Sequence, residues 1–435
     1  MGSYIPSTYE ERLEMLKSMG LTSEDDLFAA LPESIRIDGL NLPEGLNEVE
    51  VSKKLKKMAE KNKVFKTIFR GAGSYNHYIP SIVKTVTGKE EFLTAYTPYQ
   101  AEISQGVLQS IFEYQTQICE LTGMDVSNAS VYDGAVAAAE AVFMCEERRR
   151  TGVVVAGTVN PQTLEVIKTY CESRSVEVTV VEAENYSICP EKLAEALKDN
   201  TASVYIESPN YYGVLEDMDA LVEKAHGVGA KMIMGVNPIS LGLLKTPAEY
   251  GADIAVGEGQ PLGMSIAFGG PYLGFMACKQ EMIRKLPGRI VGETEDHDGR
   301  RAFVLTLQAR EQHIRREKAS SNICSNEALC AMTASVYMAA MGPEGLKKVA
   351  INSASNAHYL AERLSELGFG LKTDKPFFHE FLTELPIDGE KLEEHLASKG
   401  ILSGLPLEGG MLWCCTELTG KAEIDELIDA IKEVL

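Results

Sequence analysis

Between about residues 100 and 280, short apolar runs alternate with segments in which apolar residues recur at the spacing of a helix. The segment 103–124 predicts an amphipathic helix, because its apolar residues recur every three or four positions and fall on one stripe. The runs that predict strands are 153–156, 176–181, 203–206, 231–236, 254–257 and 273–278. Most of them are apolar on both faces and separated by helices, which predicts a mainly parallel sheet covered on both sides, with right-handed crossovers.

The two ends of the chain follow other patterns. Residues 9–19 and 49–61 carry helix-spaced apolar positions separated by turns that contain Pro and Gly, which predicts a helical arm. After about residue 325, two helical segments are separated by Gly342 and Pro343, and shorter strand and helix patterns follow. The prediction is an α/β protein with an N-terminal helical arm (1–65), a large domain (66–325) and a small C-terminal α/β domain (326–435).

Composition and charge exclude several classes of function. The chain has 435 residues, of which 45% are hydrophobic and 24% charged, and its formal net charge is −21. An acidic surface argues against nucleic acid or an anionic membrane as a partner. No apolar run approaches the roughly 20 residues that span a bilayer, and residues 1–10 lack the basic and apolar regions of a signal peptide. We therefore expect a cytoplasmic protein.

The nine cysteines are scattered, and several lie in apolar helix or strand patterns, where a free thiol behaves as a small hydrophobe. No Cys-x-x-Cys pair occurs, so we expect neither a zinc site nor a thioredoxin-type redox site, and we predict no metal site. An odd, dispersed set of cysteines fits a reducing compartment.

Two segments, 70–80 and 96–106, are dense in polar and aromatic residues without clear periodicity. Loops this rich in Tyr, Asn, His and Gln can line a site, and a well hydrogen-bonded structural turn is the alternative interpretation. A third segment, 128–135, enters the N-terminus of a predicted helix, where free backbone N–H groups can hold an anion such as phosphate. Together with the sheet and the small C-terminal domain, this pattern suggests the aminotransferase-type fold of pyridoxal-phosphate enzymes (fold type I).

Several motifs resemble the P-protein of the glycine cleavage system, glycine decarboxylase. They are Gly71-Ala-Gly-Ser-Tyr-Asn-His-Tyr78, Tyr96-Thr-Pro-Tyr-Gln100 with Glu102-Ile-Ser-Gln-Gly106, Asn128-Ala-Ser-Val-Tyr-Asp-Gly134, Gln308-Ala-Arg-Glu-Gln-His-Ile-Arg-Arg316 and Ser320-Ser-Asn-Ile-Cys324. The P-protein occurs as one long chain or as separate alpha and beta chains. This sequence resembles the alpha chain, which corresponds to the N-terminal half of the long form.

The sequence departs from the family's cofactor pattern, which belongs to the beta chain. A pyridoxal-phosphate site needs a lysine for the Schiff base and usually an acid at the pyridine nitrogen. In an ungapped comparison with the beta pattern, the position of the acid falls on Met234 and the position of the lysine on Gln260. Since neither side chain can perform these tasks, the resemblance implies that pyridoxal phosphate is on the beta subunit and is not bound covalently to this chain.

The resemblance implies a subunit of glycine dehydrogenase (aminomethyl-transferring), an oxidoreductase, which is not expected to be active alone. With the beta subunit it would decarboxylate glycine and pass the aminomethyl group to the lipoyl arm of the H-protein. This chain would supply an interface and a wall of the active site or lipoyl channel. The candidate wall residues are Tyr75, Asn76, His77, Tyr96, Thr97, Tyr99 and Gln100.

Two alternatives stay open on the sequence. One is an independent pyridoxal-phosphate enzyme that uses Lys245 or Lys279, although both lie far along the chain from the expected strand end. The other is a non-catalytic scaffold or regulatory protein with the same fold.

A local basic patch remains in this acidic chain, made of Arg300, Arg301, Arg310, Arg315, Arg316 and Lys318. Ion pairing within the chain or between subunits is the simpler interpretation of the patch. A contact near the partner's active site is the functional interpretation. The histidines of greatest interest are His77 and His313, which lie in the family motifs.

Overall fold

The computed structural model describes residues 7–37, 39–93, 97–319, 321–323 and 326–435. The chain divides into two compact units, Met1–Lys63 and Val64–Leu435. All residues of the cavity described below belong to the second unit.

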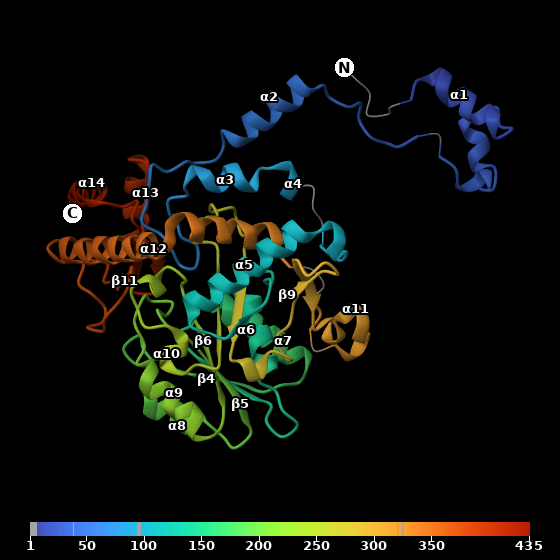
Figure 1. Cartoon of the computed structure of the whole chain (residues 1–435). Coiled ribbons are helices and arrows are strands. Elements are labelled where there is room, and N and C mark those ends of the chain that lie inside the picture. The colour runs from blue at the N-terminus through green and yellow to red at the C-terminus, as the bar shows by residue number, and fades with distance from the viewer. Residues whose placement is uncertain (1–6, 38, 94–96, 320, 324–325) are drawn as a thin grey trace. The chain divides into compact units, whose positions relative to one another are not determined.

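The first unit is helical and has almost no core of its own (Figure 1). Its two α-helices each begin with a capping box, formed by Thr8 and Asn47, which satisfies backbone N–H groups of the first turn. Leu16 is the one buried residue among the described residues of this unit. The helices are α1 (Tyr9–Ser18), η1 (Glu24–Phe28), η2 (Glu33–Ile35) and α2 (Glu48–Ala59).

The core of the second unit is a seven-stranded sheet with the order β2-β8-β7-β6-β5-β3-β4. Its strands are β2 (Val126–Ser127), β3 (Gly152–Ala156), β4 (Val178–Val181), β5 (Thr201–Glu207), β6 (Lys231–Gly235), β7 (Ile254–Glu258) and β8 (Gly274–Cys278). The five strands from β3 to β7 pair in parallel, and β8 is antiparallel to both of its neighbours. The prediction of a mainly parallel sheet is confirmed.

Helices connect the strands and flank the sheet, which buries its apolar residues on both faces (Figure 1). The connecting helices are α5 (Gln105–Thr122), α6 (Gly134–Met144), α7 (Pro161–Ser173), α8 (Pro190–Ala196), α9 (Met218–Gly227) and α10 (Pro247–Tyr250). Shorter elements are α3 (Ser81–Thr87), α4 (Glu90–Leu93), η3 (Ala101–Ile103), η4 (Ser240–Gly242), η5 (Gln280–Met282), η6 (Gln308–Arg310), α11 (Gln312–Arg315) and η7 (Arg316–Lys318). Residues 103–124, predicted as one helix, are occupied mainly by α5.

The long helix α12 (Ala328–Ser365) is two helices joined at a break. Gly342 has φ of 61° and ψ of 177°, which no α-helix contains, and Pro343 follows it. The break lies where the sequence predicts the boundary between two helical segments.

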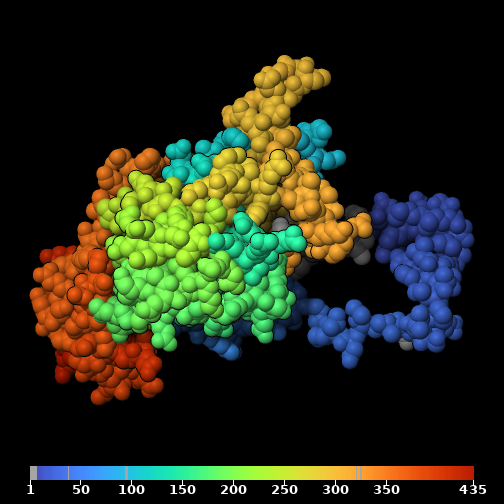
Figure 2. All heavy atoms as spheres, turned by 90° about the horizontal axis from the view of Figure 1, so that it is seen from below, coloured from blue at the N-terminus to red at the C-terminus, as the bar shows by residue number. Residues whose placement is uncertain are grey.

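The C-terminal residues form a smaller antiparallel sheet, which packs with helices around the fully buried Trp413. Its strands are β11 (Glu380–Thr383), β14 (Gly410–Cys414) and β13 (Leu405–Leu407), and its helices are α13 (Gly389–Ser398) and α14 (Lys421–Lys432). The strand β1 (Thr67–Ile68), from the start of this unit, pairs in parallel with β12 (Ile401–Leu402). Figure 2 shows these C-terminal residues in orange and red at one end of the unit.

A hairpin projects from the second unit, as the gold spheres in Figure 2 show. It consists of β9 (Ile290–Glu295) and β10 (Arg301–Thr306).

Candidate functional site

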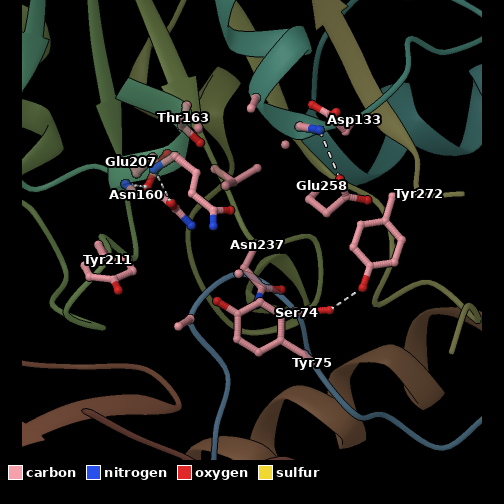
Figure 3. Close-up of a pocket in the computed structure, with 18 of the residues that line it drawn as sticks. Ser74, Tyr75, Asp133, Asn160, Thr163, Glu207, Tyr211, Asn237, Glu258 and Tyr272 are labelled. Atoms are coloured by element: carbon pink, nitrogen blue, oxygen red, sulfur yellow. Dashed lines mark hydrogen bonds between the residues drawn. The ribbon is translucent and has the colours of Figure 1, made fainter. Parts of the chain in front are cut away.

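A cavity of about 640 Å³ lies at the carboxyl ends of the parallel strands (Figure 3). The ends of β5, β6 and β7 contribute Glu207, Gly235 and Glu258, and the loop after β1 contributes Ser74 and Tyr75. The N-termini of α6 and α7 also border it. In open α/β sheets, ligands bind at this edge, because the strand ends and helix N-termini converge there.

The two residues predicted for the cofactor's acid and lysine positions lie at or next to this edge. Met234 is buried in β6. Gln260 follows β7 and is 1% exposed. Its side-chain oxygen accepts the Tyr75 N–H at 2.8 Å, and its amide nitrogen donates to the carbonyl oxygens of Tyr75 at 2.9 Å and Met264 at 2.8 Å. The Gln260 side chain therefore holds the loop that contains Tyr75 in place through hydrogen bonds.

The two alternative lysines do not line the cavity. Lys279 follows the antiparallel strand β8, so it lies at the amino end of β7, where its ammonium contacts Asp253 at 3.0 Å. Lys245 pairs with Asp219 at 2.6 Å. Neither lysine is placed where the fold holds a Schiff base, so the interpretation as an independent pyridoxal-phosphate enzyme is not favoured.

Buried carboxylates dominate the electrostatics of the cavity and its surroundings. Burial raises the pKa of Glu207 to about 7, although hydrogen bonds from the Asn160 N–H and the Tyr205 hydroxyl oppose that effect. Burial likewise raises the pKa of Glu258 to about 7. Among the described residues that line the cavity there is no Lys, Arg or His. The cavity is therefore poorly suited to a phosphate group.

The loop 70–80 is held by buried polar contacts. His77 is buried, and its Nδ1 lies 2.6 Å from a carboxylate oxygen of Glu417, whose other oxygen accepts the Tyr78 N–H at 2.7 Å. The Asn76 carbonyl accepts the Thr416 hydroxyl at 2.8 Å. Although burial opposes it, hydrogen bonding and charge from His77 lower the pKa of Glu417. Residues 76–78 are thereby tied to the loop after β14.

Tyr75 and Glu380 continue this network toward the cavity. The Tyr75 hydroxyl donates to Glu380 at 2.7 Å, and the other oxygen of Glu380 accepts the Ala72 N–H at 2.7 Å. Burial raises the pKa of Glu380 to about 7. Of the three candidate wall residues in this loop, Tyr75 alone borders the cavity.

The second predicted loop contacts a different region. Tyr96 lies outside the described residues. The Tyr99 ring is 55% exposed, and its hydroxyl accepts a hydrogen bond from the buried Arg289 guanidinium at 2.9 Å. Thr97 is half-buried and Gln100 is exposed. None of these described residues borders the cavity, so the structure does not bring the two loops into one site of this chain.

The basic patch divides into two parts. Arg300 and Arg301 pair within the hairpin, with Asp298 at 3.5 Å and Glu293 at 2.8 Å, as the ion-pairing interpretation predicts. Arg310 and Arg315 of the patch line a second cavity of about 440 Å³, together with basic residues from distant segments. The basic residues around this cavity are Arg148, Arg174, Arg284, Lys285, Arg310 and Arg315. The sequence reasoning missed this grouping, because several distant segments supply it.

Sequence reasoning also missed Asn160, Glu207, Asn237 and Glu258, which border the first cavity. Glu207 and Glu258 directly follow the predicted strands 203–206 and 254–257, and they are the last residues of β5 and β7. A charged residue at the carboxyl end of a buried parallel strand is a signal that could have identified them.

These features define the class of the protein as one with the aminotransferase-type fold. A solved structure of alanine–glyoxylate aminotransferase from Nostoc sp. matches 95% of this chain and 100% of its own, with a TM-score of 0.61 and 15% identity. That likeness shows the fold alone, and it confirms the fold prediction.

The family model for the glycine cleavage system P-protein matches residues 2–431, and this chain belongs to that family. The probable glycine dehydrogenase (decarboxylating) subunit 1 of Desulfitobacterium hafniense is 47% identical over 99% of this chain and 100% of its own length. A crystal structure of glycine decarboxylase (P-protein) of the glycine cleavage system, in inhibitor-bound form, matches with a TM-score of 0.94 and 44% identity, covering 100% of both chains. The family prediction is confirmed. Across the described residues, no helix has the length and apolarity needed to cross a bilayer.

Proposed function

We propose that this chain is subunit 1, the alpha subunit, of glycine dehydrogenase (decarboxylating), an oxidoreductase of the glycine cleavage system. With a beta subunit it decarboxylates glycine and delivers the aminomethyl group to the lipoyl arm of the H-protein. The observation that carries the proposal is the match, over nearly the full length of both chains, to relatives named as subunit 1.

The cofactor of this reaction is pyridoxal phosphate, which supplies the electron sink when bound. We assign it to the beta subunit, because Gln260 and Met234 of this chain cannot replace the lysine and the acid. The hydrogen bonds of Gln260 support this assignment, since its amide serves to hold the Tyr75 loop.

The role proposed for this chain is to form an interface and part of the partner's active-site wall. Phe268 and Ile103 are almost wholly exposed apolar side chains of the second unit, as expected for a surface that a partner covers. For the wall, exposed Tyr99 and Gln100 remain candidates with Tyr96 and Thr97. The contacts of Asn76, His77 and Tyr75 favour the alternative of a hydrogen-bonded turn that positions neighbouring residues.

Reconstitution tests the proposed function. This chain, a beta-type partner and lipoylated H-protein are purified, and glycine-dependent exchange of CO2 is measured for each chain alone and for the mixture. We expect exchange in the mixture and none with this chain alone. Mixing should also raise the melting temperature of this chain, because a partner that binds only the folded state stabilises it. Exchange by this chain alone, or a mixture without exchange or stabilisation, would contradict the proposal.

The wall proposal predicts a loss of turnover when Tyr99 is replaced by Phe. This change removes only the hydroxyl, so the complex should assemble while exchange falls about tenfold or more, equivalent to about 1.4 kcal/mol of transition-state stabilisation. Tyr99→Ala should in addition weaken assembly. Tyr78→Phe is the matched control, because Tyr78 is similarly exposed, at 59%, and bonds Glu417 through its backbone. Exchange at the wild-type rate in an assembled Tyr99→Phe complex would contradict the proposal for this hydroxyl. The same measurement on Tyr96→Phe tests the Tyr96 hydroxyl.

A further inference from the structure

The helix α6 begins at the cavity, and its N-terminus is already occupied by carboxylates. Asp133 caps the helix by accepting the Val136 N–H at 2.8 Å. Glu258, from the end of β7, accepts the Gly134 N–H at 3.0 Å (Figure 3). Free N–H groups and the helix dipole make a helix N-terminus favourable for an anion such as phosphate. Here a side chain of the same protein provides that anion.

Three backbone N–H groups hold the Glu258 carboxylate. Besides Gly134, the N–H groups of Gln260 at 2.9 Å and Leu273 at 3.0 Å donate to its second oxygen. These donors come from three separate segments, so the carboxylate is fixed in position rather than free to move aside. Glu258 also stands two residues before Gln260, on the strand end from which the fold's lysine would come.

The space beside the helix N-terminus is filled as well. A Cβ atom placed on Gly134 would lie 2.7 Å from the backbone nitrogen of Glu258, which is closer than real Cβ contacts allow. A phosphate at this N-terminus would therefore have to displace Glu258. It would also face Asp133, with no cationic side chain among the described residues that line the cavity.

We propose that Glu258 is an internal substitute for the cofactor's phosphate, which excludes phosphate-bearing ligands from this chain and leaves the cofactor to the partner subunit. The inference deepens the proposed function, on which its reference to the partner rests. In this proposal Glu258, and not only the missing lysine, determines which subunit binds the cofactor. Restoring a lysine at position 260 alone would accordingly not create a cofactor site.

The test compares Glu258→Ala with the wild-type full chain at pH 8, which lies above the raised pKa of Glu258 of about 7. Binding of inorganic phosphate, pyridoxal 5′-phosphate and pyridoxal is measured by equilibrium dialysis and by the shift in melting temperature. We expect Glu258→Ala to bind inorganic phosphate and pyridoxal 5′-phosphate at least tenfold more tightly than the wild type. Binding of pyridoxal, which has no phosphate, should be unchanged.

Two further variants keep the result interpretable. Glu207→Gln removes a different buried carboxylate of the same cavity and should bind phosphate as weakly as the wild type. Glu258→Ser replaces Glu258→Ala where the latter does not fold, since its hydroxyl can still accept one of the N–H groups. A folded Ala or Ser variant without a gain in phosphate binding would overturn the proposal, and so would wild-type protein that binds phosphate as tightly as the variants. Phosphate binding is measured without glycine or the partner subunit. A negative result for this inference can therefore be distinguished from failure of the reconstitution.

Discussion

Borohydride reduction of the assembled complex in the presence of pyridoxal phosphate is expected to label a lysine of the partner and none of this chain. The reason is that we assign Gln260 to the lysine position, and an amide forms no imine. No lysine is found among the described residues that border the cavity. Peptide mapping by mass spectrometry after reduction measures the outcome for both chains.

The same reduction on this chain alone is the control, and it should give no stoichiometric adduct. The two lysines to examine first are Lys245 and Lys279, which pair with Asp219 and Asp253. The hydrogen bond to Asp219 raises the pKa of Lys245 and so favours its protonated amine, which is not a nucleophile. A stoichiometric adduct on either lysine would restore the interpretation as an independent enzyme.

Replacement of Gly213 by Ala is expected to destabilise the fold by about 3 kcal/mol or more. Gly213 has φ of 82°, a conformation that disfavours any side chain. A Cβ atom there would lie 1.9 Å from the carbonyl oxygen of Glu380, so the backbone of β11 would have to move. Overpacking and backbone strain each cost about 1–3 kcal/mol. The unfolding midpoint in urea, at constant m-value, measures the change.

Gly227→Ala is the matched control for that prediction. Gly227 is an exposed residue at the end of α9, and a Cβ atom there would meet nothing within 4 Å. We expect a neutral or slightly stabilising change, because Ala restricts the unfolded chain more than Gly does. A Gly213→Ala protein as stable as Gly227→Ala would show that the approach of the Gly213 loop to Glu380 is not tight.

The sequence could be used to locate strand ends but not the long-range contacts of the site. Met234 lies one residue before the end of β6, and Gln260 lies two residues after the end of β7. The Tyr75 loop borders the cavity, but its partners Glu380 and Glu417 are more than 300 residues away. No local pattern specifies which carboxylate will meet a given loop.

The sequence by itself determined the alternation of strands and helices, the break at Gly342 and the family. Each of these follows from local information: apolar runs that must be buried, a residue that permits positive φ, and motifs of adjacent residues. Only the tertiary structure decided that Glu258 lies on the N-terminus of α6, 124 residues away, and that the Tyr75 and Tyr99 loops face different neighbours. The physical reason is that a backbone N–H donates to any suitable oxygen that the packed core brings within about 3 Å, so the partner is determined by the packing of the whole sheet.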